Sequence, residues 1–327
     1  MYIILLFIVG GVIALGFGAQ IIVSSAINLA NIYKISGYFI GFTVVALGTS
    51  LPELAATIQA LNVVDSVNIA LGNIIGSNIA NILLILGVVS IINPILFSEE
   101  KGQRNQTLMV LIITVIAASI FYFLTKNPNT NSIFIGVILL LIFFIFLIFQ
   151  YRIELANRVN IPTAKNYSKF ISYLLLIIGL VFLYFGSKYF IMGSQKLAIS
   201  FNVSETIIGL TLVAFGTSLP ELATGIVAAL RKQSNLAVGT ILGSNIYNIV
   251  GIFALILFMK SGEFPIGSEV LMTNIIIMTI ITFIFVYKVR FGFKFLNIKA
   301  FQLTKNTGIF FLILYVIYTL YNYLKLN

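Results

Sequence analysis

Long apolar segments follow one another along most of the chain and are joined by short polar connections. About 20 apolar residues are needed to cross the hydrocarbon core of a bilayer. The pattern therefore predicts an all-α polytopic membrane protein with ten transmembrane helices. The predicted spans are residues 2–30, 36–62, 66–92, 104–125, 131–150, 168–197, 204–230, 234–259, 268–289 and 305–324.

Two blocks of sequence occur twice. Residues 41–54 read GFTVVALGTSLPEL and residues 209–222 read GLTLVAFGTSLPEL, while GNIIGSNIAN at 72–81 returns as GTILGSNIYN at 239–248. Five predicted spans, an odd number, separate the matching blocks, so the second copy enters the membrane in the opposite direction. This pattern is typical of the inverted-topology repeats of secondary transporters.

The predicted organisation is two five-helix repeats around a short linker. The first repeat occupies residues 1–150, with its motif at about 41–87. A polar cytoplasmic linker follows at 151–167, and the second repeat occupies 168–327, with its motif at about 209–254. The linker is too short to hold a regulatory domain.

Composition agrees with a membrane protein and restricts its chemistry. Hydrophobic residues make up 60% of the chain, charged residues 9%, and the mean hydropathy is +1.11. The chain has no His, Cys or Trp, which excludes disulfides, imidazole or thiolate metal sites and histidine-based catalysis. A hydrolase with two acids is disfavoured as well, because the lone Asp65 lies in a loop. We therefore expect no enzyme and no cofactor.

The net charge of +10 comes from Lys and Arg residues that lie almost entirely in short loops. One set of alternate loops is rich in them, and the other holds only Lys126, Lys196, Lys260 and Lys325. The positive-inside rule then places both termini on the extracellular or periplasmic side of a plasma membrane. The need to orient the protein in the membrane explains the positive net charge, so we expect no nucleic-acid partner. Lys188 falls inside the sixth span, and we interpret it as a snorkelling or partly interfacial side chain outside the site rather than as part of an ion pathway.

Two acids remain well inside the apolar spans, Glu53 and Glu221, one in each copy of GTSLPEL. An ionisable residue at this depth is costly and is rarely kept without a function. A proline precedes each glutamate and is expected to kink the helix and release carbonyl oxygens near Gly48 and Gly216. Hydroxyl and carbonyl oxygens then surround each carboxylate, a ligand set that suits hard cations such as Ca²⁺ or Na⁺.

The second block supplies a polar helix face in each half. Ser77 and Asn81 are four residues apart and share a face, as do Ser244 and Asn248. Such residues often only hydrogen-bond between transmembrane helices. Their pairing with two glutamates favours a central cation site over that alternative.

The two blocks resemble the α-repeats of the cation/calcium exchanger superfamily and are most similar to the prokaryotic sodium/calcium exchangers. The resemblance implies an antiporter that exchanges Na⁺ for Ca²⁺, both bound as transported substrates. It implies a Ca²⁺ site made by the carboxylates of Glu53 and Glu221 and the carbonyls of Thr49 and Thr217. It implies Na⁺ sites that add the carbonyls of Ala46 and Ala214 and the hydroxyls of Ser50, Ser77, Ser218 and Ser244, with Asn81 and Asn248 lining the middle.

The chain departs from the family pattern at Asn248, where this branch often carries Asp. One ionisable group fewer leaves the coupling ion open, so the alternative is an H⁺/Ca²⁺ antiporter or one that uses K⁺ or Li⁺. The proton-coupled members usually carry a Gly-Asn-Ala-x-Glu motif in place of GTSLPE, which favours Na⁺. The expected partners are Ca²⁺, Na⁺ and the lipid bilayer, with the oligomeric state left open, a monomer included. A non-transporting membrane scaffold is the remaining alternative.

Overall fold

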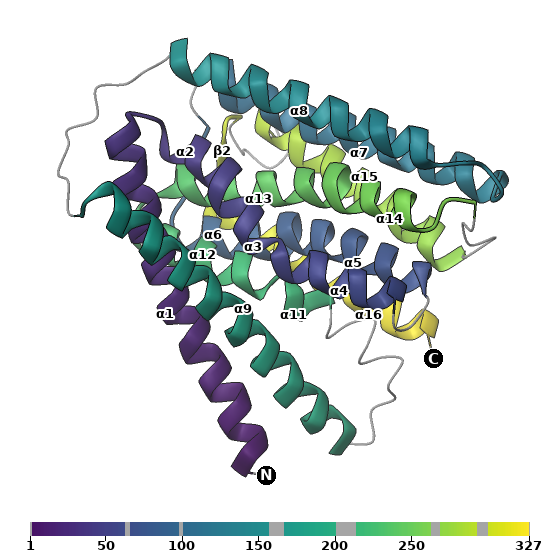
Figure 1. The fold of residues 1–327 in the computed structure, drawn as a ribbon, viewed down its shortest axis with the longest axis horizontal. Helices are drawn as coiled ribbons and strands as arrows, with labels where there is room; N and C mark the ends of the chain where they lie inside the picture. The colour runs from purple at the N-terminus through teal and green to yellow at the C-terminus, as the bar shows by residue number, and fades with distance from the viewer. Residues whose placement is uncertain are drawn as a thin grey trace.

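The structure is a computed structural model that describes residues 2–62, 66–97, 101–156, 167–200, 214–262, 269–292 and 300–326. The first part of the predicted seventh span, 204–213, lies outside these residues, as does the loop residue Asp65. The described chain forms a bundle of helices in which α1 and α9 run side by side and extend away from the rest (Figure 1).

The first half contains helices that are broken near their middles. Its elements are α1 Tyr2–Tyr33, α2 Gly37–Ile40, η1 Gly41–Val45, α3 Ala46–Thr49, α4 Leu51–Asn62, α5 Val67–Ala80, η2 Asn81–Ile85, α6 Leu86–Ile92, β1 Ile95–Leu96, α7 Lys101–Lys126 and α8 Ile133–Ala156. The η segments are single stretches of π-helix inside longer helices. π-Helical turns are frequent at functional sites.

The second half has a similar order of elements. They are α9 Lys169–Ser200, α11 Ala214–Thr217, α12 Leu219–Leu230, α13 Ser234–Ile246, η4 Tyr247–Ile252, α14 Phe253–Met259, α15 Glu269–Phe291, β2 Gln302–Leu303 and α16 Lys305–Leu326. The strands β1 and β2 pair antiparallel, with Ile95 opposite Leu303, and so join the two halves at one end of the bundle.

Nine helices in the described residues are long and apolar enough to cross a membrane. They coincide with nine of the ten predicted spans. The predicted seventh span, 204–230, is described only from Ala214 onward, where α12 is a shorter apolar helix. The prediction of an all-helical polytopic protein is confirmed to this extent.

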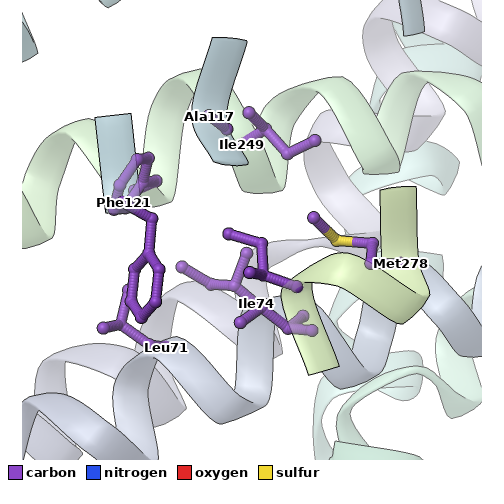
Figure 2. Close-up of a pocket in the computed structure, with 9 residues that line it drawn as sticks. Leu71, Ile74, Ala117, Phe121, Ile249 and Met278 are labelled. Atoms are coloured by element: carbon purple, nitrogen blue, oxygen red, sulfur yellow. The ribbon is translucent and has the colours of Figure 1, made fainter. Parts of the chain in front are cut away.

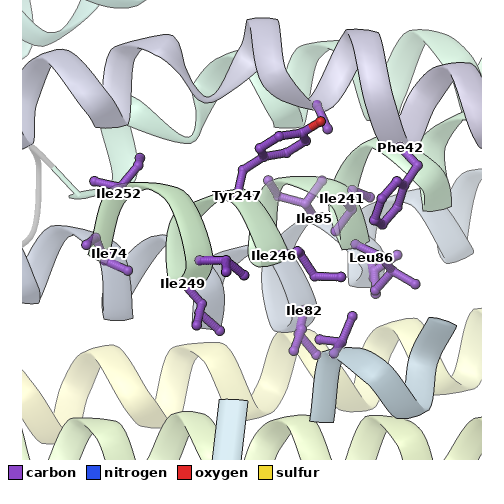
Figure 3. Close-up of a cluster of buried hydrophobic side chains, with 14 of the residues drawn as sticks. Phe42, Ile74, Ile82, Ile85, Leu86, Ile241, Ile246, Tyr247, Ile249 and Ile252 are labelled. Atoms are coloured by element: carbon purple, nitrogen blue, oxygen red, sulfur yellow. The ribbon is translucent and has the colours of Figure 1, made fainter. Parts of the chain in front are cut away.

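The spans built from α5–η2–α6 and from α13–η4–α14 form the centre of the bundle, since they are the most buried of the nine. A cluster of apolar side chains packs around them (Figure 3). Its labelled members are Phe42, Ile74, Ile82, Ile85, Leu86, Ile241, Ile246, Tyr247, Ile249 and Ile252. This packing holds the polar faces of the two central spans in fixed positions.

A small cavity of about 20 Å³ lies between α5, α7, η4 and α15 (Figure 2). Leu71, Ile74, Phe121, Ile249 and Met278 are among the apolar side chains that line it. Buried water needs polar partners, so a cavity with this lining is expected to stay dry. It offers no ligand to an ion.

Helices α1 and α9 approach closely through glycines. A Cβ at Gly18 would lie 2.9 Å from the Gly179 carbonyl oxygen, and one at Gly186 would lie 3.0 Å from that of Gly11. Small residues let transmembrane helices meet backbone to backbone. The first helices of the two halves therefore pack directly on one another.

Helix α13 approaches α2 and η1 closely through two glycines four residues apart. A Cβ at Gly239 would lie 2.2 Å from the Tyr38 carbonyl oxygen, and one at Gly243 would lie 2.5 Å from that of Phe42. No described atom lies within 4 Å of a Cβ built at Gly72. The segment that would correspond to Tyr38–Phe42 lies outside the described residues.

Replacing Gly239 with Ala is expected to destabilise the protein, because the new methyl group overlaps a backbone oxygen that cannot move independently. Overpacking of this kind costs about 1–3 kcal/mol. Thermal unfolding in detergent should show a lower Tm for Gly239→Ala. The matched control is Gly10→Ala on an exposed part of α1, where no described atom lies within 4 Å of the added methyl group. Equal Tm values for the two variants would contradict the close packing.

Candidate cation-binding site

Both copies of GTSLPEL break their helix at the same residue. Helix α3 ends at Thr49 and α4 begins at Leu51, with Ser50 between them at φ −83° and ψ 4°. Ser218 stands between α11 and α12 at φ −86° and ψ 3°. The proline falls in the first turn of the new helix, where its missing N–H is tolerated. The predicted kink is thus confirmed in both copies.

The break places each glutamate in the first turn of a helix, Glu53 in α4 and Glu221 in α12. Backbone N–H groups without partners make this end of a helix favourable for a negative charge. It also frees carbonyl oxygens, and that of Gly216 accepts a hydrogen bond of 2.7 Å from the Ser187 hydroxyl on α9. Both glutamates are fully buried.

Each glutamate is bound by the serine of the opposite half. The Ser50 hydroxyl donates to Glu221 Oε1 at 3.3 Å, and the Ser218 hydroxyl donates to Glu53 Oε1 at 3.4 Å. The two contacts correspond under the sequence repeat. Glu221 also accepts a hydrogen bond of 3.1 Å from Ser244. The two heptapeptides therefore cross at the centre of the bundle.

Hydroxyl groups extend this crossing to the central helices. Thr49 Oγ1 lies 3.5 Å from Ser244 Oγ, and Thr217 Oγ1 lies 3.5 Å from Ser77 Oγ. Ser218 Oγ lies 3.0 Å from Ser77 Oγ. All of these side chains are buried.

The asparagines form a second pair of contacts between the halves. Asn81 Nδ2 donates to Asn245 Oδ1 at 2.8 Å, and Asn248 Nδ2 donates to Asn78 Oδ1 at 3.4 Å. The sequence motif contains all four residues, and the two bonds again correspond under the repeat. Asn81 begins η2 and Asn248 lies in the first turn of η4, so both sit where the central spans turn π-helical.

Four buried oxygens at this centre have no hydrogen-bond partner among the described residues. They are Glu53 Oε2, Glu221 Oε2, Asn81 Oδ1 and Asn248 Oδ1. A buried acceptor without a partner costs roughly 1–3 kcal/mol, so native proteins seldom leave one. Four acceptors in two symmetric pairs can be satisfied together by bound cations.

The ligand set fits a transported hard cation better than a resident transition metal. The described residues contain no group of three or more acidic, His or Cys side chains. The centre offers two carboxylates together with hydroxyl, amide and backbone oxygens, which are ligands that Ca²⁺ and Na⁺ accept.

The two alanines of the predicted site lie one turn before the break. The Ala46 carbonyl oxygen accepts from Ser50 N at 3.0 Å and from the Thr49 hydroxyl at 3.3 Å. The Ala46 carbonyl oxygen can therefore bind a cation only if the Thr49 side chain rotates away from it. Ala214 begins α11, and the surroundings of its side chain are outside the described part of the structure.

Asn73 joins the site as well and was not predicted from the sequence. Its Nδ2 donates to the Glu53 carbonyl oxygen at 3.2 Å, and its Oδ1 accepts from Thr217 Oγ1 at 3.1 Å. It precedes Ser77 and Asn81 by four and eight residues and so shares their face, a spacing that could have revealed it. The corresponding Thr240 bonds only within its own helix in the hydrogen bonds described, to the Leu236 carbonyl oxygen at 3.0 Å. The two halves of the site therefore differ here.

A cavity of about 540 Å³ lies beside the crossing and reaches the residue that precedes Glu53. Pro52 and Thr217 form part of its lining. Lys188, which the sequence analysis placed outside any site, also lines this cavity and is exposed. The sequence favoured a snorkelling side chain over a role in an ion pathway, and the cavity reopens that second interpretation.

Comparison with known proteins identifies the family. The model of the family described as sodium/calcium exchanger protein matches residues 3–152 and 171–324. The chain belongs to the sodium/calcium exchanger family. Members of this family are membrane transporters and not catalytic enzymes. The chain is therefore a multi-pass membrane protein that exchanges another cation for Ca²⁺.

Individual relatives agree over most of the chain. The uncharacterized membrane protein MJ0091 of Methanocaldococcus jannaschii is 35% identical over 308 residues, which are 94% of each protein. The sodium/calcium exchanger MaX1 of Methanosarcina acetivorans is 29% identical over 287 residues, 75% of this chain and 80% of that protein. A solved structure of the sodium-calcium exchanger NCX_Mj, soaked with Na⁺ and Sr²⁺, has a TM-score of 0.79 at 32% identity and covers 95% of this chain and 96% of that one.

Proposed function

We propose that this exchanger couples Na⁺ to Ca²⁺ and that the two ions compete for one central site formed around Glu53 and Glu221. The observation that carries this proposal is the pair of fully buried carboxylates, each with one oxygen lacking a hydrogen-bond partner among the described residues. Each carboxylate is also bound by the serine of the opposite half. The two halves thus share one site.

The charges of the site support competition. Two ionised carboxylates neutralise one Ca²⁺, whereas three Na⁺ leave a net charge of +1. Either load offsets the cost of two buried negative charges, but an empty site retains that cost. A carrier that reorients readily when loaded and slowly when empty couples the movement of one ion to that of the other.

We assign the ligands as the family resemblance implies. Ca²⁺ is held by the carboxylates of Glu53 and Glu221 and the carbonyls of Thr49 and Thr217. Na⁺ uses in addition the carbonyls of Ala46 and Ala214 and the hydroxyls of Ser50, Ser77, Ser218 and Ser244, with Asn81 and Asn248 between the sites. The contacts among these residues support the assignment.

We further propose that the fold is a ten-helix inverted repeat with residues 1–150 and 168–327 as its halves. The paired hydrogen bonds support it, since each bond has a counterpart at the repeat spacing. Residues 204–230 would supply the seventh span and bring the number of spans to ten. The distribution of Lys and Arg favours a plasma-membrane protein with both termini outside and the linker inside.

Transport by purified protein in liposomes tests the coupling ion. We expect an outward Na⁺ gradient to drive ⁴⁵Ca²⁺ uptake, and K⁺, Li⁺ or H⁺ gradients offered separately to drive little. Uptake driven by a pH gradient in sodium-free buffer would replace the Na⁺ assignment with proton coupling. If no gradient moves ⁴⁵Ca²⁺, the proposed function is wrong.

A further inference from the structure

We propose that Lys188 is a specificity-determining residue of the cation entrance. Its positive charge lies in the cavity beside the site and disfavours the entry of Ca²⁺ more strongly than that of Na⁺. This inference rests on the proposed function, because it assumes that cations reach Glu53 and Glu221 through this cavity.

The cavity is placed as an entrance to the site. One wall comes from α4 and the start of α5, including Ala56, Gln59 and Ile69, and the other comes from α9, including Lys188 and Ile191. Its lining includes Pro52 and Thr217, which immediately precede Glu53 and Ser218 in the chain. A cation in this cavity is therefore close to Glu53 and to Ser218, which donates to it.

Helix α9 is fixed to the site beside Lys188. The hydroxyl of the preceding residue, Ser187, donates to the Gly216 carbonyl oxygen at 2.7 Å, and this bond ties α9 to the broken helix. Ser187 also lines the cavity. The position of the lysine relative to the entrance is thus set by a buried contact, although its own side chain is exposed.

Lys188 is the one charged residue among the described residues that line this cavity. Gln59, Gln195, Tyr184, Ser187 and Thr217 are neutral, and the other lining residues are apolar. No acid in the described part of the lining compensates the charge of this lysine. Charges that line a cleft with low-dielectric walls alter the local concentration of ions.

The effect depends on the valence of the ion. A unit positive charge about 10 Å from a monovalent cation in water lowers the local concentration of that cation roughly twofold. The same charge lowers the local concentration of a divalent cation about fourfold. The Ca²⁺ effect is the square of the Na⁺ effect wherever in the cavity the ion stands. Salt removes both effects, because the Debye length falls from about 30 Å at 0.01 M to about 3 Å at 1 M ionic strength.

The test uses Lys188→Gln in liposomes, with ions added on the side to which the cavity opens. At low ionic strength, the half-maximal Ca²⁺ concentration is expected to fall about fourfold relative to the wild type, and the half-maximal Na⁺ concentration about twofold. Lys188→Arg keeps the charge and should behave as the wild type. Both differences should disappear when an impermeant salt raises the ionic strength to about 1 M.

Lys196→Gln is the matched control. Lys196 lies on the same helix, but its Nζ stands 5.2 Å from the centre of the Phe7 ring and it is not part of the cavity lining. Its replacement should leave both half-maximal concentrations unchanged. The inference is wrong if Lys188→Gln matches the wild type at low ionic strength, or if it shifts both ions by the same factor. Absence of transport by the wild type would instead refute the proposed function.

Discussion

Replacing Glu221 with Gln is expected to abolish Na⁺-dependent Ca²⁺ transport, with a loss of at least about 100-fold in the rate at a fixed Ca²⁺ concentration. The amide keeps the volume of the side chain and removes one of the two negative charges. Removing one partner of a buried charge pair costs about 3–5 kcal/mol, which corresponds to more than 100-fold in binding. Ca²⁺ would then keep an uncompensated positive charge in a fully buried site.

Glu53→Gln should give the same loss, because the two carboxylates hold equivalent positions. Glu53 accepts from Ser218, as Glu221 accepts from Ser50. The measurement is ⁴⁵Ca²⁺ uptake driven by a Na⁺ gradient. A second readout is the Tm in detergent with and without Ca²⁺, since a ligand that binds only the folded protein raises its stability. We expect the Ca²⁺-dependent rise in Tm to disappear in both variants.

Glu269→Gln is the matched control for these two variants. Glu269 begins α15 and is exposed, away from the crossing of the heptapeptides. Its transport and its Ca²⁺-dependent Tm should equal those of the wild type. A non-transporting scaffold would show no change in Ca²⁺-dependent Tm when Glu53 or Glu221 is replaced. Transport retained by Glu53→Gln or Glu221→Gln would contradict the proposed site.

The sequence predicted much of the fold because membrane spans and helix breaks have local causes. Span length follows from the thickness of the bilayer, and the breaks at Ser50 and Ser218 follow from the proline two residues later. Because GTSLPEL occurs twice, the same helix break was predicted in each half. The seventh span shows the limit, since its first part lies outside the described residues and the count of ten stays a prediction.

The contacts between the halves could not be read from local sequence. Which serine binds which glutamate depends on how two distant helices cross, and the answer, Ser50 with Glu221, joins residues 171 positions apart. Asn73 was missed because it has no polar amide counterpart in the second block, where Thr240 stands. Lys188 was placed outside the site because hydropathy shows depth in the membrane and not the cavity that a side chain lines.

Asn248→Asp is expected to raise the apparent affinity for Ca²⁺ on the order of tenfold at pH 8 and to add a further dependence on pH to that of the two glutamates. Asn248 is fully buried, and its Oδ1 has no hydrogen-bond partner among the described residues. A carboxylate in its place adds a third negative charge beside the cation. One favourable charge contact with a net worth of about 1.4 kcal/mol is a tenfold change.

The packing around Asn248 allows this replacement. Its Nδ2 donates to Asn78 Oδ1 at 3.4 Å, and an aspartate cannot make that donation. Asn78 Nδ2 has no hydrogen-bond partner among the described residues, so rotation of the Asn78 amide would turn this donor toward the new carboxylate. The new carboxylate at position 248 would then face the Asn78 Nδ2 donor and not the Asn78 Oδ1 acceptor.

The sign of the pH effect follows from competition between protons and cations for the added group. At low pH the new carboxyl binds a proton, loses its charge and ligates Ca²⁺ no better than the amide. The affinity gain should therefore be largest at high pH and disappear as the pH falls. Half-maximal Ca²⁺ concentrations measured from pH 5 to pH 8 would show it as a variant-to-wild-type ratio that approaches one at the acidic end.

Two further variants decide whether the effect belongs to the site. Asn81→Asp places the acid at the repeat-related position, where Oδ1 likewise has no partner among the described residues, and should change the affinity in the same direction. Asn322→Asp places an acid on α16, where Asn322 pairs with Asn274 and not with the crossing helices, and should leave it unchanged. Equal pH profiles for Asn248→Asp and the wild type would show that position 248 lies too far from the bound ion to ligate it. In that case the presence of Asn in place of Asp at position 248 would have no part in setting which ion this exchanger couples to Ca²⁺.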